Sequence, residues 1–196
     1  MFKKILLATH NLNKVTELKA MLSPYNIEVL SAADLDLPDV EETGTTFAEN
    51  ASLKAEILSK ITSLPCLADD SGLCVDALNG RPGVYSARYA PNRNFDIAME
   101  NLLKEISDSG SSNRKAHFSC VLAFKVPQQS VRIFEGRVNG EISFEKKGTS
   151  GFGFDPIFIP EGYNQTFAEM SAEQKASLSH RGLALQKFIS EVFKTV

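Results

Sequence analysis

The chain of 196 residues has few cysteines, no long apolar run and no excess of positive charge. Its three cysteines, Cys66, Cys74 and Cys120, form no CxxC pair, which argues against a disulfide framework or a zinc site and favours a reducing compartment. Lys plus Arg number 21 and Asp plus Glu number 24, so the formal charge of −3 disfavours nucleic-acid binding. No apolar stretch approaches the length of a membrane span or a signal-peptide core. We therefore expect a cytoplasmic protein with no nucleic-acid or membrane partner.

Several catalytic signatures are also absent. The sequence contains no GxxxxGK[ST] phosphate loop, no GxSxG nucleophile elbow and no HExxH metalloprotease motif. Apolar residues make up 43% and charged residues 23%, close to the averages for globular proteins. The length suits one domain, and we expect a single domain over residues 1–196.

The hydrophobic pattern predicts an α/β protein. Apolar runs predict strands over residues 5–8, 28–30 and 66–68, and strict alternation predicts a strand over 118–126. A hairpin turn is predicted at 127–130, after which Val131, Ile133, Ile142 and Phe144 continue the sheet. Helical periodicity predicts helices ending near residue 23, starting at the capping box of Thr46 and Glu49, and covering 95–106 and 185–196. A βα start followed by a β-meander between helices indicates a mixed sheet flanked by helices.

The first candidate for chemistry is the segment Thr9-His10-Asn11-Leu12-Asn13-Lys14, which lies between a buried strand and a helix. A helix N-terminus offers free N–H groups and partial positive charge, so it binds anions, and Lys14 adds a full charge. The alternative is that Asn11 or Asn13 only caps the helix.

Two acidic pairs, Glu41-Glu42 and Asp69-Asp70, form the second candidate. Asp69-Asp70 is expected just past the strand of residues 66–68, where Ser71-Gly72 predicts a turn, and strand ends are where open α/β sheets place ligands. Carboxylates without nearby His or Cys favour a hard cation, Mg²⁺. The alternative is a simple turn and solvated glutamates.

Two further segments carry aromatic rings or cations. Gly151-Phe152-Gly153-Phe154-Asp155-Pro156 offers close backbone approach and rings that stack on bases, or else a tight loop with its phenylalanines in the core. Lys175 with His180-Arg181 can recognise a base edge or a phosphate, or else forms a solvated helix start.

Taken together, these segments resemble the inosine triphosphatase-like family, the non-canonical purine nucleoside triphosphate pyrophosphatases. The matching strings occur in the family's order along nearly the whole chain: residues 8–14, 41–51, 68–73, 83–90, 151–157 and 166–169 continuing into 179–182. The resemblance implies hydrolysis of ITP, dITP or XTP to the monophosphate and pyrophosphate with Mg²⁺, which cleanses the nucleotide pool. It also implies an elongated α/β fold with an active-site cleft between two lobes, and a homodimer.

The resemblance also assigns roles to residues. Asp70 is implied as the general base and, with Glu41, as a Mg²⁺ ligand, while Lys54 shares a helix face with Asn50 and can support the phosphates. Substrate contacts are implied for Thr9, His10, Asn11, Leu12, Asn13, Lys14, Ser71, Phe152, Gly153, Phe154, Asp155, Lys175, His180 and Arg181.

The chain departs from the family pattern at three places. Phe154 stands where Tyr is frequent, His10 where Gly is frequent, and Gln174 where Glu is common. Two other activities stay open: release of orthophosphate from the γ position, and nucleotide binding without catalysis.

Overall fold

The computed structural model describes residues 2–193. Its strands are β1 (Lys4–Leu7), β2 (Glu28–Ser31), β3 (Cys66–Val75), β4 (Lys115–Lys125), β5 (Arg132–Ile142) and β6 (Phe158–Pro160). Its α-helices are α1 (Leu12–Leu22), α2 (Phe47–Thr62), α3 (Phe95–Asp108), α4 (Ala172–Leu178) and α5 (His180–Val192). The strands form one sheet in the order β2-β1-β3-β4-β5-β6.

The sheet is mixed. β1 pairs in parallel with β2 and with β3, whereas β5 and β6 pair antiparallel. The chain divides into two compact units, and β3, β4 and β5 each contribute residues to both. Unit 1 comprises residues 1–70, 120–136 and 183–196, and unit 2 comprises residues 71–119 and 137–182. The predicted α/β class with a mixed sheet flanked by helices is confirmed.

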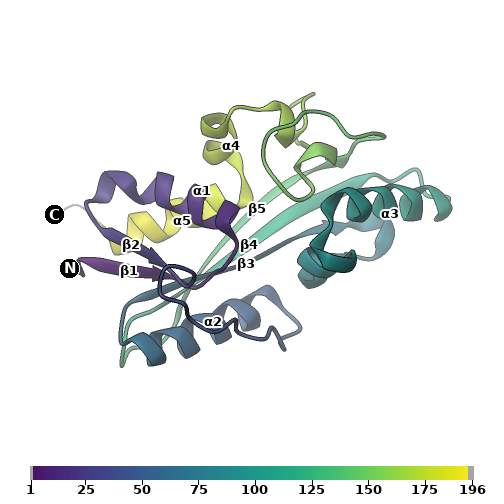
Figure 1. Ribbon diagram of the computed structural model, residues 1–196. Coiled ribbons are helices and arrows are strands. Elements are labelled where there is room, and N and C mark those ends of the chain that lie inside the picture. The colour runs from purple at the N-terminus through teal and green to yellow at the C-terminus, as the bar shows by residue number, and fades with distance from the viewer. Residues whose placement is uncertain (1, 194–196) are drawn as a thin grey trace. The chain divides into compact units, whose positions relative to one another are not determined.

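Unit 1 is built in three layers, with α1 and α5 on one face of its strands and α2 on the other (Figure 1). Alternation along β1 explains this arrangement, because Ile5 and Leu7 pack in the core under α1 and α5, whereas Leu6 and Ala8 pack in the core under α2. Strands buried on both faces are expected to be apolar throughout, so polar residues within them stand out.

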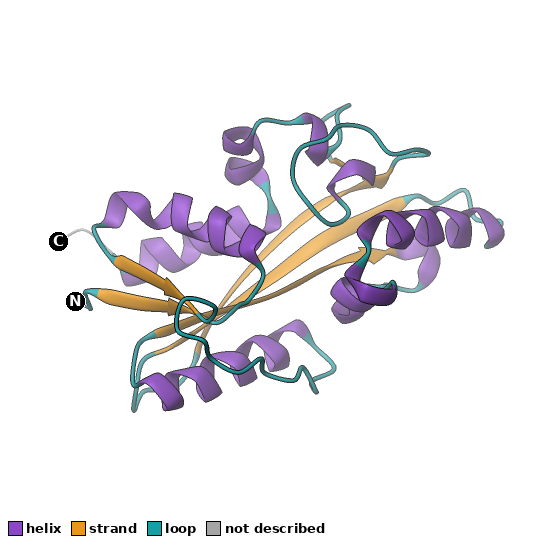
Figure 2. Cartoon of the chain, in the orientation of Figure 1, coloured by secondary structure: helices purple, strands orange, loops and turns teal. Residues whose placement is uncertain are grey.

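Unit 2 packs α3 and two long loops against its strands (Figure 2). Its core joins Leu102 of α3 and Phe118 of β4 to Phe158 of β6 and to Phe154 and Phe167, which lie outside the strands and α-helices. Phe118 lies with its ring centroid 4.7 Å from that of Phe158, in an edge-to-face arrangement. This unit therefore combines one helix, α3, with aromatic residues of strands and loops, whereas helices cover both faces of the strands in unit 1.

Most predicted elements are confirmed, including the helix that starts at Thr46, where both halves of the capping box form. Three expectations were wrong. β3 does not stop at residue 68 but runs to Val75, Phe144 lies outside the sheet with 85% of its surface exposed, and the closing helix starts at His180 rather than Leu185. Val196, expected in that helix, lies outside the described residues.

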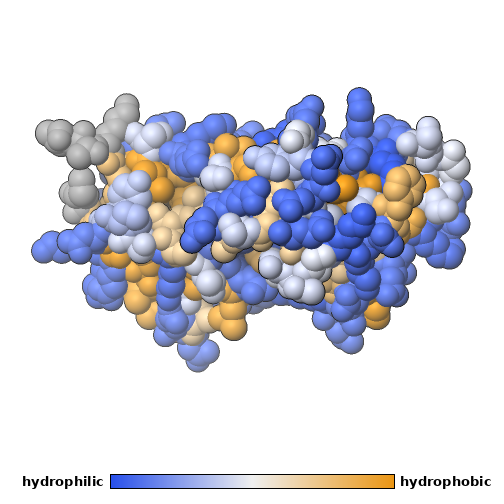
Figure 3. All heavy atoms as spheres, turned by 90° about the horizontal axis from the view of Figure 1, so that it is seen from above, coloured by the Kyte–Doolittle hydropathy of each residue, from blue (hydrophilic) through white to orange (hydrophobic). Residues whose placement is uncertain are grey.

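The surface seen from above is mostly hydrophilic, and hydrophobic residues form small scattered groups (Figure 3). Within residues 2–193, no helix combines the length and the apolar character that crossing a bilayer requires.

Candidate functional site

Buried charge marks the candidate site. Charged side chains are rarely buried unless they are paired, because losing water costs more than most single contacts return. Within residues 2–193, every buried Asp, Glu, Lys, Arg or His belongs to a segment that the sequence singled out: Lys54, Asp69, Asp70, Asp155, Lys175, His180 and Arg181. The first three belong to unit 1 and the other four to unit 2.

Asp69 and Asp70 lie inside β3, not in a turn after it. Because successive strand residues point to opposite faces, the two carboxylates meet different helices. Asp69 accepts a hydrogen bond from Lys14 of α1 at 2.5 Å, whereas Asp70 lies 3.4 Å from the ammonium of Lys54 of α2. The expected pair of neighbouring carboxylates at a strand end is therefore corrected to two separate Lys–Asp pairs, one on each face of the sheet.

Lys54 joins three groups of unit 1. Its ammonium donates to Glu42 at 2.8 Å and to the backbone carbonyl of Asp69 at 2.9 Å, besides its contact with Asp70. Burial alone would lower the pKa of Lys54, but the charges of Asp70 and Glu42 outweigh it and raise the pKa. Lys54 is therefore a cation that holds Glu42, and with it the acidic loop of residues 31–45, beside Asp70.

The carboxylate of Asp70 is buried and only partly compensated by its neighbours. Burial raises the pKa of its carboxyl above the ordinary value; the negative charge of Glu42 adds to this, and Lys54 and Lys14 oppose it. Its Oδ2 atom is buried and has no hydrogen-bond partner among residues 2–193. A buried carboxylate oxygen without a partner is unusual in a folded protein and suits a group that acts on a ligand, a water or a metal.

The start of α1 is arranged by its own side chains. Asn11 is the N-cap, and its carbonyl oxygen accepts from the backbone N–H groups of Asn13 and Lys14 at 3.0 and 3.3 Å. Thr9 accepts from the backbone N–H of Asn11, and Leu12 is 70% exposed. The capping alternative is thus confirmed for Asn11, and anion binding at this helix start stays a prediction.

The loop of residues 31–45 is tied to the same helix start. His10 donates through Nε2 to the carbonyl of Leu37 at 2.9 Å, and its Nδ1 lies 3.6 Å from Asp39. Glu41 is exposed, has no ion pair among the described residues and makes no contact with Asp70, whereas Glu42 reaches it through Lys54. The structure therefore links Glu42, not Glu41, to the buried carboxylate.

In unit 2, Asp155 organises the glycine-rich loop. Its carboxylate accepts from the backbone N–H of Phe152 at 2.7 Å and from the ammonium of Lys175 at 2.6 Å. Gly151 has φ +75°, and a Cβ there would clash with Asp155. This glycine thus makes room for a protein carboxylate, although the sequence suggested that it makes room for a ligand.

The two phenylalanines of this loop have different environments. Phe154 is buried in the core and packs edge-to-face against Phe95, with 5.4 Å between the centroids. Phe152 is only half-buried, and the cations of Lys175 and Arg181 lie 4.8 and 5.6 Å from its ring centroid. The core alternative therefore holds for Phe154, and Phe152 is the ring placed beside cations.

His180 and Arg181 begin α5 and are both buried. The His180 ring stacks on Phe118 with a centroid distance of 4.6 Å and an interplanar angle of 9°. Arg181 donates to the hydroxyl of Ser71 at 3.1 Å, so it lies next to the residue that follows Asp70 in β3. The sequence alternative of a solvated helix start was wrong for both residues.

The donor set fits a hard divalent cation that keeps most of its own water. Within residues 2–193, no group of three or more His, Cys, Asp or Glu side chains is arranged to hold a metal. Mg²⁺ commonly uses one or two carboxylates together with water and substrate phosphates. Asp70, with its unpartnered buried oxygen, and the exposed Glu41 can each supply one such ligand.

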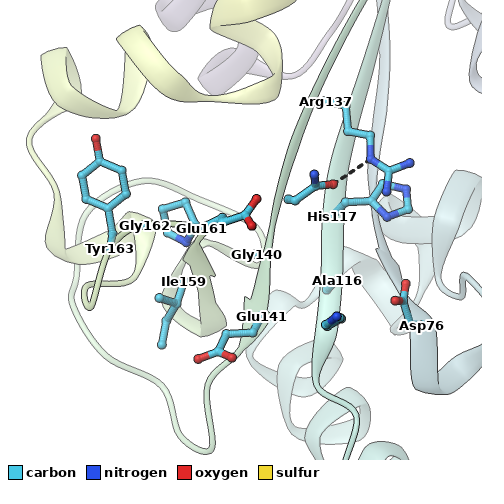
Figure 4. Close-up of a pocket in the computed structure, with 13 residues that line it drawn as sticks. Asp76, Ala116, His117, Arg137, Gly140, Glu141, Ile159, Glu161, Gly162 and Tyr163 are labelled. Atoms are coloured by element: carbon cyan, nitrogen blue, oxygen red, sulfur yellow. Dashed lines mark hydrogen bonds between the residues drawn. The ribbon is translucent and has the colours of Figure 1, made fainter.

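Unit 2 also contains a polar cavity of about 490 Å³ away from these residues (Figure 4). None of the predicted site residues lines it. Figure 4 shows His117 and Arg137 on one wall and Glu161 and Tyr163 on another, with Asp76 beside the first pair. The lining has about as many cationic as carboxylate side chains, so it does not indicate whether a ligand would be an anion or a cation.

Three residues that contact the site were not predicted as site residues: Glu42, which pairs with Lys54, Cys120, which contacts Asp69, and Phe118, which stacks on His180. The only sequence signal at Phe118 and Cys120 is the alternation typical of a strand, which predicts that they are buried but not which residues they contact. The signal for Glu42 was present in the Glu41-Glu42 pair, but a loop has no periodicity to tell which residue faces inward.

The lysine–carboxylate pairs on both faces of one strand in unit 1, and the cations beside an aromatic ring in unit 2, are features of proteins that bind small anionic or aromatic ligands. The chain belongs to the Ham1 family, whose profile matches residues 5–191, and the resemblance drawn from its motifs is confirmed. It is 46% identical over 193 residues to a dITP/XTP pyrophosphatase of Streptomyces avermitilis, with 96% of each chain covered. It is 48% identical over 187 residues to a dITP/XTP pyrophosphatase of Bacillus licheniformis, covering 94% of this chain and 95% of the relative.

A solved structure agrees over the full length. The HAM1 protein from Coxiella burnetii matches with a TM-score of 0.90 and 38% sequence identity, and all of both chains is covered.

Proposed function

We propose that this protein hydrolyses ITP, dITP and XTP to the nucleoside monophosphate and pyrophosphate, and so removes these nucleotides from the pool. The observation that carries the proposal is the near full-length identity of 46% to a relative named dITP/XTP pyrophosphatase. The seven buried charged residues support it, because they fall in segments that a polyphosphate and a purine base would need.

In this proposal, unit 1 handles the phosphates and the water. Lys14 and the start of α1 neutralise the polyphosphate, and Lys54 holds the acidic loop beside Asp70. Asp70 takes a proton from water through its free Oδ2, and its raised pKa brings it closer to the working pH of a general base. Asp70 and Glu41 would hold Mg²⁺, which when bound neutralises phosphate charge.

Unit 2 would recognise the base. Phe152 offers a ring face for stacking, and Lys175, His180 and Arg181 offer donors for a 6-oxo group. The exocyclic amino group of adenine is itself a donor, so it would face the protein donors and leave both sides without a hydrogen bond. The polyphosphate and base functions are therefore assigned to different units of the chain.

The proposal includes a cytoplasmic homodimer. None of the three cysteines forms a disulfide, which supports a reducing compartment. The dimer rests on the family resemblance alone, and light scattering coupled to size-exclusion chromatography tests it through the mass of the particle in solution.

The deciding experiment incubates purified protein with Mg²⁺ and ITP, with ATP and GTP in parallel, and identifies the products. We expect IMP and pyrophosphate, with ITP far ahead of ATP. Formation of IDP and orthophosphate would place the cut at the γ position, and folded protein without turnover of any nucleotide would favour a binding function. Omission of Mg²⁺, with chelator present, should abolish turnover.

A further inference from the structure

A chain of contacts runs beneath the proposed phosphate region of unit 1. The thiol of Cys120 in β4 donates to Oδ2 of Asp69 at 3.2 Å, and Oδ1 of Asp69 accepts from the Lys14 ammonium at 2.5 Å. The Asp69 side chain is fully buried, and that of Lys14 is 15% exposed. The contacts therefore lead from the interior of the sheet to a cation at the edge of solvent.

Each partner has a physical reason to be there. A buried carboxylate requires a cation, and Lys14 supplies it. A carboxylate has two oxygens, and the Cys120 thiol engages one of them, which orients the other toward Lys14. A lysine stem is flexible, so an ammonium held by one of its three donors is fixed in space and keeps two donors for a ligand.

We infer that Asp69 and Cys120 are positioning residues that hold the Lys14 ammonium in place for the polyphosphate. The inference rests on the proposed function and deepens it by assigning the first aspartate of the pair. Both oxygens of Asp69 already have protein partners, whereas Oδ2 of Asp70 has none within residues 2–193. Asp69 thus positions Lys14, whereas Asp70 can contact water and metal.

The fixed cation has a consequence for catalysis. A charge that is already oriented needs no rearrangement when phosphate charge develops in the transition state, so preorganisation contributes to rate as well as to affinity. Loss of the Cys120 donor should therefore lower kcat as well as weaken binding, through Lys14 and not through a general loss of packing.

The test uses Cys120→Ala and Cys120→Ser in the wild-type and Lys14→Met backgrounds, with Cys66→Ala as the control. Cys66 is equally buried on β3 but packs in the other core of unit 1. With ITP and Mg²⁺, we expect Cys120→Ala to lower kcat/KM about fivefold, as loss of one hydrogen bond predicts, and Cys120→Ser to recover most of that loss. In the Lys14→Met background, Cys120→Ala should change kcat/KM less than about twofold, because Cys120 acts through the Lys14 ammonium, which that background lacks.

A second measurement does not depend on turnover. Calorimetric titration with inorganic tripolyphosphate in the absence of Mg²⁺ should show about fivefold weaker binding to Cys120→Ala, and unchanged binding to Cys66→Ala. Asp69→Asn should weaken binding about tenfold or more, because the neutral amide no longer holds the ammonium.

The outcomes separate the inference from the proposed reaction. Tighter tripolyphosphate binding to Asp69→Asn would show that Asp69 competes with phosphate for Lys14, and the inference would be wrong. Equal effects of Cys120→Ala with and without Lys14 would also overturn it. If wild-type protein does not hydrolyse ITP but tripolyphosphate binding shows the Cys120–Lys14 coupling, the proposed reaction fails and the inference stands.

Discussion

The two units of this chain use buried charge in different ways. In unit 1, the charges form direct ion pairs between a central strand and two helices, as in Lys14 with Asp69 and Lys54 with Asp70. In unit 2, Lys175 also forms a buried ion pair, with Asp155 of the glycine-rich loop, but its cation lies over the ring of Phe152 as well. Ion pairs on rigid elements suit the fixed geometry of polyphosphate chemistry, and aromatic loops suit recognition of a flat base.

Under the proposed function, this difference would assign the reaction to unit 1 and the selection of the base to unit 2. Changes in unit 1 should affect turnover for every nucleotide alike, because the phosphates are common to all. Changes in unit 2 should alter the choice among bases and the stability of a loop. The variants below, in order of decreasing expected effect, test whether that separation holds.

The largest effect is expected for Asp70→Asn, which removes the proposed base without changing shape. We expect kcat for ITP to fall about 10²- to 10⁴-fold, the usual contribution of general base catalysis. Single-turnover product formation measures it, with the exposed Asp76→Asn as the control. Wild-type turnover in Asp70→Asn would remove Asp70 from the mechanism.

The same variant should not lose stability. The pKa of Asp70 is raised in the folded state, so its stabilising contribution is present below the unfolded pKa and is lost as pH rises through the folded value. At pH 7 the ionised carboxylate therefore costs stability, and Asp70→Asn should melt at the same or a higher temperature than wild type. Thermal melts should show the difference shrinking toward pH 4. A lower melting temperature at pH 7 would contradict this.

The second effect tests unit 2. Lys175→Met leaves Asp155 buried without its cation, and breaking such a pair costs about 3–5 kcal/mol of unfolding free energy. Urea denaturation measures the loss, and KM for ITP should rise because the Phe152 loop is no longer held. The double variant Lys175→Met with Asp155→Asn, which removes both charges, should regain a large part of the stability. Equal losses in the single and double variants would mean that the ion pair does not hold this loop.

The same contrast explains what the sequence could predict. The strand and helices around Lys14 and Lys54 follow from hydrophobic periodicity and a capping box, so their positions were foreseeable. The run Asp69-Asp70-Ser71-Gly72 was expected to turn, since carboxylates and glycine disfavour strands. It stays extended because helices on both faces supply a lysine to each carboxylate, a tertiary effect that no local pattern contains.

In unit 2 the sequence identified the segments but not the partners. The glycine-rich loop was found, yet nothing local distinguishes Phe152, which faces cations, from Phe154, which faces Phe95 in the core. The burial of His180 and Arg181 was also not predictable, because a polar helix start is usually solvated. Residues far apart in the sequence, such as Phe118 and Ser71, determine these environments.

The third effect concerns the pH profile and distinguishes the charges around Asp70. Glu42→Gln removes a negative neighbour, which should lower the pKa of Asp70 and move the acid limb of log kcat/KM toward lower pH. Lys54→Met removes a positive neighbour and should move the limb toward higher pH. Rates measured at fixed free Mg²⁺ give both shifts. Glu191→Gln, on the exposed surface of unit 1, is the control. Shifts of the same sign in both variants would rule out this electrostatic account.

The smallest effect is expected for His10→Gly, which replaces the chain's own residue by the one frequent in the family. The variant loses the hydrogen bond from His10 to Leu37 and the contact with Asp39, both at an exposed position where such bonds contribute about 1 kcal/mol or less. We expect faster amide exchange in residues 36–40 and a KM for ITP about two- to threefold higher, with kcat little changed. His10→Gln, which keeps a side-chain donor, should lie between the variant and wild type. Because Glu42 reaches Asp70 from this same loop, an acid-limb shift in His10→Gly as large as that of Lys54→Met would mean that the position of the loop, and not charge alone, sets the pKa of Asp70. The properties of unit 1 would then depend on the position of the loop of residues 31–45 as well as on its ion pairs.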